Sequence, residues 1–413
     1  MIAFRVGSVP ACGIRWSGRS KMRQPLRIHA DRSATRLAVA FGLALTVTAT
    51  ACAHRSAVEP GASGTEPARA EATVADKAVN LYDEGRYDEA RVLLEQLDAE
   101  GKLTGPLLYR LGFCHGQALD AKGQTEFMQR ALVELQKEAA TGDSLEVSFF
   151  LANALNNVDR AADARKVAAD ATTRIENGTW PKPAQPIDQF RLAKLYQDQG
   201  RTADAVPHYR AALAQWELVG AQVPGYQKWS RRYLGQDSIA RADFRQAEAD
   251  FRALTSLGGA SASDFDRLAV CRVRVSDWQG AADAWREAEK LDPANSDRPR
   301  YCRNLALLAA TAGTLPSTNP KGTAWTATST EDLEATMANE AKTLRDARTE
   351  AAAGITPQRK AELEKTVSTA KGNFAAAGLE YAARYLDIRQ TAFTGGYAPL
   401  IFHPEEWTAE PPS

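Results

Sequence analysis

Residues 192–212, with the sequence LAKLYQDQGRTADAVPHYRAA, decide the fold of this chain. Leu192, Ala193 and Tyr196 lie on one stripe of a helix. Gly200 ends that helix, because glycine tolerates the left-handed backbone that commonly follows a helix end. The stretch therefore begins with one short amphipathic helix.

A second helix follows directly. Thr202 is its expected N-cap, and Ala205, Tyr209 and Ala212 recur at intervals of four and three residues on one face. The small Ala205 lets the two helices approach closely, and the large Tyr209 fills the groove against the next pair. The stretch as a whole predicts two antiparallel helices joined by a short turn.

The same spacing recurs along the chain. In each copy a Leu followed by Gly or Ala precedes an Ala by thirteen residues, and a further core residue comes four positions later. A partial copy places Ala90 and Leu94 behind Leu81-Tyr82. Self-similarity at this period predicts an array of helical repeats. The full copies are Leu151-Ala152 with Ala164 and Ala168, Leu192-Ala193 with Ala205 and Tyr209, Leu234-Gly235 with Ala247 and Phe251, and Leu268-Ala269 with Ala281 and Trp285.

This pattern resembles the tetratricopeptide repeat (TPR), whose elements include Leu-Gly and Ala-x3-Phe. The resemblance covers residues 71–312 and implies an all-α fold, a TPR-like helix-turn-helix solenoid of six pairs with a seventh first helix at 300–312. The second copy, Leu111-Gly112, departs from the pattern because Gln124 stands where the Ala belongs. Wide spacing between copies predicts inserted loops near residues 181–183 and 223–225.

The N-terminus has the pattern of an export signal. Basic residues precede a 15-residue apolar run, Leu37–Ala51, too short to span a bilayer comfortably. We interpret residues 1–51 as an N-terminal extension and signal peptide, with Met22 as an alternative start. Cys52 follows small residues and resembles the lipidated cysteine of a bacterial lipobox, although the preceding Ala-x-Ala also suits ordinary signal peptidase.

Residues 52–70 are rich in Ala, Gly, Ser, Pro and Glu, which predicts a flexible tether. With a lipid anchor on Cys52, the protein is expected to be an outer-membrane lipoprotein that faces the periplasm. The alternative is a soluble periplasmic or secreted protein. In that oxidising space Cys271 and Cys302 either form a disulfide between neighbouring first helices or remain buried free thiols.

The residue types that carry chemistry are sparse. The chain holds equal numbers of basic and acidic residues, and residues 1–51 contain eight basic residues and one acidic one. The remainder therefore has seven more acidic than basic residues, which disfavours nucleic acid as a partner. No histidine pairs with another ligand at metal-binding spacing, and neither a phosphate loop nor a nucleophile elbow occurs. These observations predict a non-enzyme with no cofactor and no small-molecule substrate.

The predicted binding surface lies on the first helices, which line the inner wall of such arrays. Aromatic residues recur at one level and amides at the next. Aromatic side chains are common binding hot spots, and amides can pair with the backbone of an extended peptide. In the alternative interpretation, the aromatics are buried in the stack and the amides are merely solvated. The candidate partner-binding residues are Tyr109, Phe149, Asn153, Asn156, Phe190, Lys194, Gln197, Trp229, Arg232 and Gln236.

The period disappears after residue 312. Residues 313–329 are predicted to be a linker or long loop, and residues 330–394 an antiparallel helical hairpin with a heptad seam. The hairpin either caps the open end of the stack or docks a partner helix. The tail, 395–413, is apolar enough to pack back onto the body.

Together these features predict a non-enzymatic protein-binding scaffold or adaptor of the bacterial cell envelope. Its concave face would hold an extended segment of another envelope protein, and a lipid on Cys52 would attach it to the membrane. The alternative is an envelope protein that binds peptidoglycan or another carbohydrate.

Overall fold

The computed structural model describes residues 73–312, 314–398 and 401. This part of the chain contains sixteen α-helices, and its only β-pairing is an isolated bridge between Thr318 and Ala324. The all-α class is therefore confirmed. Within the same residues, no helix has both the length and the apolar character that a bilayer crossing requires. The predicted signal peptide, Cys52 and the tether lie outside the described residues.

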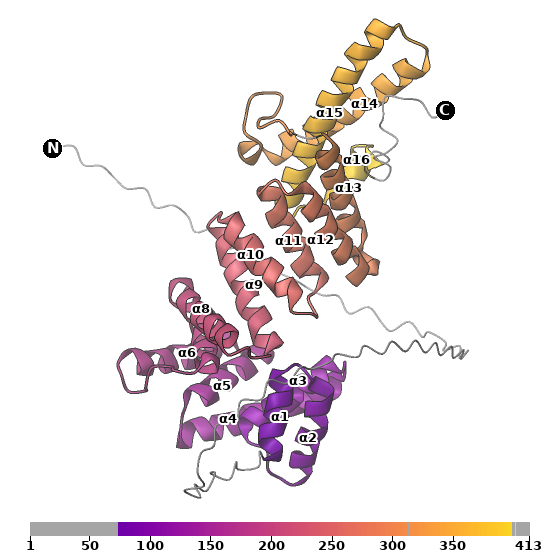
Figure 1. Ribbon diagram of the computed structural model, residues 1–413. Coiled ribbons are helices and arrows are strands. Elements are labelled where there is room, and N and C mark those ends of the chain that lie inside the picture. Colours follow the sequence, from indigo (N-terminus) through magenta and orange to yellow (C-terminus); the bar gives the residue numbers. More distant parts are fainter. Residues whose placement is uncertain (1–72, 313, 399–400, 402–413) are drawn as a thin grey trace, which may run out of the picture. The chain divides into compact units, whose positions relative to one another are not determined.

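Six helix pairs and a seventh first helix follow one another along the chain (Figure 1). The two helices of each pair pack against each other, and each pair contacts the next. This confirms the TPR-like solenoid. The pairs are α1 (Val74–Asp83) and α2 (Tyr87–Ala99), α3 (Gly105–Gln117) and α4 (Ala121–Thr141), α5 (Leu145–Asn157) and α6 (Ala161–Glu176), α7 (Pro186–Asp198) and α8 (Thr202–Leu218), α9 (Pro224–Ala240) and α10 (Phe244–Ser256), α11 (Ala262–Arg274) and α12 (Trp278–Leu291), followed by α13 (Asp297–Ala312).

The template residues form the core between the paired helices. Ala205 and Tyr209 of α8 are fully buried, as are their counterparts Ala247 and Phe251 of α10. A Cβ atom added at Gly235 of α9 would lie 2.6 Å from the Phe251 ring. The Leu-Gly element therefore provides room for the aromatic residue of the second helix.

In the second pair, the second helix lacks the template Ala, and glycines on the first helix allow the close approach instead. Added Cβ atoms at Gly105, Gly112 and Gly116 of α3 would lie 2.7–3.2 Å from Leu135, Met128 and Gln124 of α4. Small residues on α3 thus substitute for the template Ala that α4 lacks. Gln124 is accommodated because the facing residue, Gly116, has no side chain.

One residue of left-handed backbone joins the two helices of every pair. It lies two positions after the end of the first helix, and its φ is between 59° and 80° in all six repeats. The prediction that Thr202 is an N-cap is wrong by one residue, because Thr202 is the first residue of α8 and Arg201 is the N-cap. The Arg201 guanidinium donates to Asp204. The six left-handed residues are Gly85, Leu119, Asp159, Gly200, Ala242 and Ser276.

Of the two predicted insertions, only one is a long loop. Residues 177–185 connect α6 to α7, and Pro183 accepts a hydrogen bond from Gln189 at 2.6 Å. Residues 223–225, by contrast, begin a helix, because Pro224 is the first residue of α9. Proline suits this position, where its missing N–H is not needed. The extra residues therefore lengthen α9 instead of forming a loop.

A helical hairpin follows the array, formed by α14 (Thr330–Ala352) and α15 (Pro357–Ala383). Its predicted seam, which includes Ala370, Phe374 and Ala377, is buried. Helix α15 packs against both α13 and α11, and an added Cβ at Gly378 would lie 2.9 Å from Leu305. The hairpin thus covers the last two first helices of the array and continues their core.

Residues 314–328 form a packed loop and not a free linker. Trp325 is buried and donates its indole N–H to the Pro316 carbonyl at 2.7 Å. Asn319 is buried and accepts from the backbone N–H groups of Lys321 and Thr323. Arg384, just after α15, donates to the Trp325 and Thr328 carbonyls at 3.1 and 2.8 Å. The loop is therefore fixed to the hairpin.

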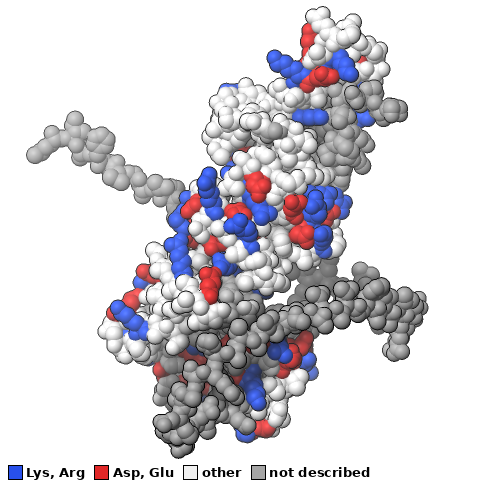
Figure 2. Space-filling model, in the orientation of Figure 1, with Lys and Arg blue, Asp and Glu red and all other residues white. Residues whose placement is uncertain are grey.

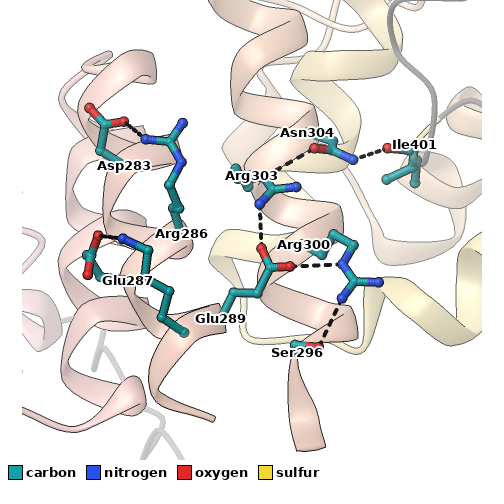
Figure 3. A network of polar contacts seen from close by, with 10 residues as sticks. Asp283, Arg286, Glu287, Glu289, Ser296, Arg300, Arg303, Asn304 and Ile401 are labelled. Carbon is teal, nitrogen blue, oxygen red and sulfur yellow. Dashed lines mark hydrogen bonds and ion pairs between the residues drawn. The ribbon is translucent and has the colours of Figure 1, made fainter. Parts of the chain in front are cut away.

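The chain after the hairpin returns to α13. Helix α16 (Ile388–Thr394) packs on α13, and Tyr397 and Ile401 are buried. Figure 3 shows Asn304 of α13 donating to the Ile401 carbonyl, while Glu289 of α12 accepts from Arg300 at 3.0 Å. The described part of the predicted tail, 395–398 and 401, therefore packs onto the body, and the rest lies outside the described residues.

Cys114, Cys271 and Cys302 are buried free thiols. The predicted alternative of a disulfide between Cys271 and Cys302 is therefore wrong. Burial raises the pKa of both thiols to about 12, so they remain protonated and unreactive at neutral pH.

Basic and acidic side chains are interspersed over the face shown in Figure 2. Many charged side chains of the described residues form ion pairs, such as Arg130 with Asp98 and Arg359 with Glu350. That face therefore carries no extended field of one sign.

Candidate functional site

The first helices of the N-terminal repeats enclose a pocket of about 180 Å³, called the aromatic pocket below. Six of the ten predicted partner-binding residues line it: Tyr109, Phe149, Asn153, Phe190, Lys194 and Trp229. The other lining residues are Tyr82, Asp83, Tyr87, Phe113, Phe150, Gly225 and Tyr226. The first helices α1, α3, α5, α7 and α9 thus contribute to one concave site, and α2 adds Tyr87.

The inner wall of the pocket is a continuous set of aromatic rings. Phe190 lies 6.0 Å from Phe149 and 4.9 Å from Tyr226 between ring centroids, and Tyr109 lies 5.1 Å from Phe150. Tyr109, Phe149 and Phe190 are only 9%, 7% and 4% exposed. These three residues therefore hold neighbouring repeats together and also form the floor of the pocket, which corrects the prediction that they line an open groove.

Helix α9 closes the pocket against the first repeat. Its extension places Tyr226 beside Asp83, the last residue of α1, and the Tyr226 hydroxyl donates to Asp83 Oδ1 at 2.9 Å. A Cβ at Gly85 would lie 3.7 Å from Pro224, and one at Gly225 would lie 3.2 Å from Tyr87 Oη. The concave face is thus a bounded pocket here.

Trp229 forms an exposed rim. Its side chain is 41% exposed, and its indole N–H donates to Gln197 Oε1 at 3.4 Å. Gln197 also accepts from the Tyr209 hydroxyl at 2.6 Å. Lys194 Nζ lies 5.7 Å from the centre of the Trp229 ring and pairs with Asp198. The rim is therefore fixed by polar contacts while the Trp229 ring remains open to solvent.

Buried charges lie behind the aromatic wall. The Arg110 guanidinium lies 4.5 Å from the Phe150 ring centre, and its Nε is enclosed without a hydrogen-bond partner. Glu146 accepts from Arg110 at 3.3 Å and from Arg191 at 2.5 Å. Burial raises the pKa of Asp83, and the nearby Arg110 charge offsets this only in part.

Four predicted residues lie outside the pocket lining. Arg232 makes two 2.7 Å hydrogen bonds to Asp264 of the next repeat, so its guanidinium stabilises the array. Gln197 supports the rim from behind. Gln236 is exposed and Asn156 half-buried, and neither meets the aromatic rings of the pocket. The ten candidate residues, which come from the second to the fifth repeat, therefore do not all lie in one pocket.

The concave side of the sixth repeat is covered by the hairpin. Arg274 of α11 pairs with Glu380 of α15, and Glu380 is buried and also accepts from Arg384 at 2.8 Å. A partner segment cannot reach this part of the inner face while α15 lies there.

Tyr82, Asp83, Tyr87 and Tyr226 belong to the site but were not predicted. The candidate residues were chosen by their position relative to the Leu-Gly or Leu-Ala pair of each copy. The first repeat has no such pair, so none of its residues was chosen. Tyr226 precedes the template part of α9. Pro224 was the available signal, because proline at a helix start would have extended α9 to include Tyr226.

The described residues contain no group of three or more His, Cys, Asp or Glu side chains arranged to hold a metal ion. His115 stacks on Phe127, and His208 stacks on Tyr196. The His115 ring also contacts Asp120 through Nδ1 at 2.9 Å. Both histidines therefore have structural partners.

No protein-family model matches this chain, and no curated protein matches it in sequence. Among solved structures, it is similar to PilW, a type IV pilus biogenesis factor, with 16% identity and a TM-score of 0.33 over 53% of this chain and 92% of PilW. The C-terminal part of a TPR repeat-containing protein from Cytophaga hutchinsonii gives 16% identity and a TM-score of 0.23 over 53% and 95% of the two chains. The TPR2AB domain of yeast Sti1, in a complex with pHSP90, gives 13% and 0.21 over 71% and 98%. These similarities give no information about what this chain binds.

Proposed function

We propose that this protein is a non-enzymatic scaffold that holds an extended segment of a partner protein, with the aromatic pocket as its anchoring point. The observation that carries the proposal is the convergence of nine aromatic side chains on one bounded pocket, eight from five first helices and one, Tyr87, from α2. Buried aromatic clusters with an exposed tryptophan are typical of binding hot spots.

The dimensions and composition of the pocket favour one side chain of a partner over a free ligand. Its volume of about 180 Å³ is below the range of roughly 300–1,000 Å³ usual for drug-sized ligands. Asn153 stands at the edge of the aromatic floor and donates to the Phe149 carbonyl at 2.9 Å. Its amide oxygen can therefore accept a hydrogen bond from the backbone of a bound segment.

The envelope setting belongs to the same proposal and is supported by the N-terminal sequence. The apolar run before Cys52 and the tether after it favour export and a lipid anchor in the outer membrane, facing the periplasm. The partners would then be other envelope proteins. Labelling cells with an alkyne fatty acid tests this, because Cys52→Ser should abolish incorporation; equal incorporation in both proteins would contradict a lipid at Cys52.

Pull-down from cells with the full chain tests the binding role. Trp229→Ala removes the exposed ring at the pocket rim, and Leu218→Ala is the matched control, because Leu218 is 86% exposed outside the pocket. We expect Trp229→Ala to lose at least about 2 kcal/mol of partner affinity, as hot-spot residues do, while the control retains it. Equal capture by both variants would overturn the proposal.

A further inference from the structure

Asp83 has an unused carboxylate oxygen at the aromatic pocket. Its Oδ1 accepts from the Tyr226 hydroxyl at 2.9 Å. Within the described part of the chain, Oδ2 has no hydrogen-bond partner and Asp83 has no ion pair; Oδ2 is not among the enclosed atoms that lack a partner, and the residue is half-buried. The pocket therefore presents one solvent-accessible acceptor that carries negative charge.

The other charges near the pocket are satisfied within the protein. Arg110 and Arg191 influence Asp83 electrostatically, yet each has carboxylate partners of its own. Lys194 is buried and paired, so its positive charge is already matched. The internal sets are Lys194 with Asp198, Arg191 with Asp188 and Glu146, and Arg110 with Glu146. These sets contain three cations and three carboxylates. Asp83 is a fourth carboxylate, and it is the only one of the four without an ion pair.

The rings around Asp83 suit a cation with an apolar stem. Tyr82, Tyr87 and Phe113 pack edge to face, with centroids 5.3–5.5 Å apart. The Trp229 ring at the rim already accepts one ammonium group, that of Lys194 at 5.7 Å. Aromatic faces attract ammonium groups, and more strongly where water is excluded. A lysine side chain combines such a head group with a stem that aromatic walls can cover.

We infer that the aromatic pocket selects a lysine side chain, whose ammonium group pairs with Asp83 and whose stem lies among the rings of Tyr82, Phe113 and Tyr226. The inference rests on the proposed function, since the lysine is presented by the extended partner segment. It goes further by assigning the anchoring chemistry and a specificity-determining residue, Asp83.

Calorimetric titration of the full chain tests this with short capped peptides. The probes are an alanine-rich pentapeptide with a central lysine, the same peptide with norleucine or glutamate in its place, and an uncapped alanine peptide that offers only an N-terminal ammonium. We expect the lysine peptide to bind at least about tenfold more tightly than each of the other three, the gain of one charge-assisted hydrogen bond. Norleucine or glutamate binding as well as lysine would overturn the inference, and so would preference for the free N-terminus.

Asp83→Asn keeps the shape of the side chain and removes its charge, and should reduce lysine binding about tenfold while leaving the norleucine peptide unchanged. Asp159→Asn is the matched control, because Asp159 is exposed in the turn after α5. Thermal melts establish that both variants are folded. No lysine preference with intact partner capture in the pull-down would remove the inference and leave the scaffold standing. Loss of the difference between Trp229→Ala and Leu218→Ala would remove the scaffold itself.

Discussion

Tyr226 donates its hydroxyl hydrogen to Asp83 at 2.9 Å, although 143 residues separate the two in sequence. The bond joins the fifth repeat to the end of the first helix of the array. Contacts in stacked repeats are normally confined to neighbours, so this pair is a direct link between distant repeats. It bounds the pocket on the concave face of the first five repeats, while the rim at Trp229 stays open to solvent.

Tyr226→Phe should therefore loosen the first repeat. The change removes one hydrogen bond to a charged acceptor, at a cost of about 1.5–3 kcal/mol. Hydrogen exchange should show faster opening of α1 and α2, with little change in α11 and α12. Tyr385→Phe is the control, because Tyr385 is 41% exposed in a turn far along the chain. Uniform acceleration across all repeats would contradict the assigned link.

Asp83 should make stability depend on pH in a defined direction. Burial raises its folded pKa above the ordinary value of 3.8, so the ionised carboxylate costs stability at neutral pH. As pH falls through the raised pKa, protonation removes this cost, and below the unfolded pKa the group contributes nothing. Asp83→Asn keeps an oxygen for Tyr226 and should be more stable than the parent at pH 7. The difference in free energy of unfolding should vanish near pH 3; a growing difference toward low pH would contradict the assignment.

Leu119 occupies a left-handed backbone position, with φ of 61°, and its side chain is 92% exposed. Side chains other than glycine cost roughly 1–2 kcal/mol there. Leu119→Gly should therefore raise the free energy of unfolding by about 1 kcal/mol, the steric relief less the larger chain entropy of glycine.

Leu218→Gly is the matched control for that change. Leu218 is equally exposed, at 86%, but ends α8 with helical geometry, where glycine costs up to about 1 kcal/mol. Urea denaturation should therefore give opposite signs for the two leucine-to-glycine variants. The same sign at both sites would mean that the turn of the second repeat is not left-handed.

Glu380 connects the hairpin to the array through Arg274. Glu380→Gln leaves the partly buried Arg274 and Arg384 without their counter-charge, and breaking such a buried pair costs about 3–5 kcal/mol. Glu350→Gln is the control, because the Glu350–Arg359 pair within the hairpin is exposed and exposed pairs contribute little to stability. Thermal unfolding should separate the two variants clearly; equal stability would show that the hairpin docks by apolar contacts alone.

Much of the fold could be predicted from the sequence, because its cause is local. Ala205 and Tyr209 are buried, and so are the residues at the same positions in the other copies. The heptad seam of α15 is also buried, as expected. Of the six left-handed turn residues, only Gly200 was predicted, because glycine is the usual residue in that geometry. Leu119 and Ala242 adopt the same geometry because the packed helices on either side impose it, and neither residue type indicates this on its own.

The candidate site was only partly predictable, for a related reason. Phe149, Asn153 and Lys194 follow from the helix register and do line the pocket. The pairing of Tyr226 with Asp83, the covering of Arg274 by α15 and the pairing of Arg232 with Asp264 depend on how repeats meet in space. Periodicity along the chain specifies which face a residue occupies, and it does not specify what covers that face.

Site-specific photo-crosslinking in cells tests the central claim most directly. A photoreactive phenylalanine analogue at position 229 stands at the rim of the pocket, and the same analogue at position 218 stands on a surface outside it. We predict that position 229 alone gives an adduct, which mass spectrometry maps to one extended, lysine-containing segment of a single envelope protein. Adducts of equal yield from both positions, or none from position 229, would contradict the assignment of the aromatic pocket as the partner site.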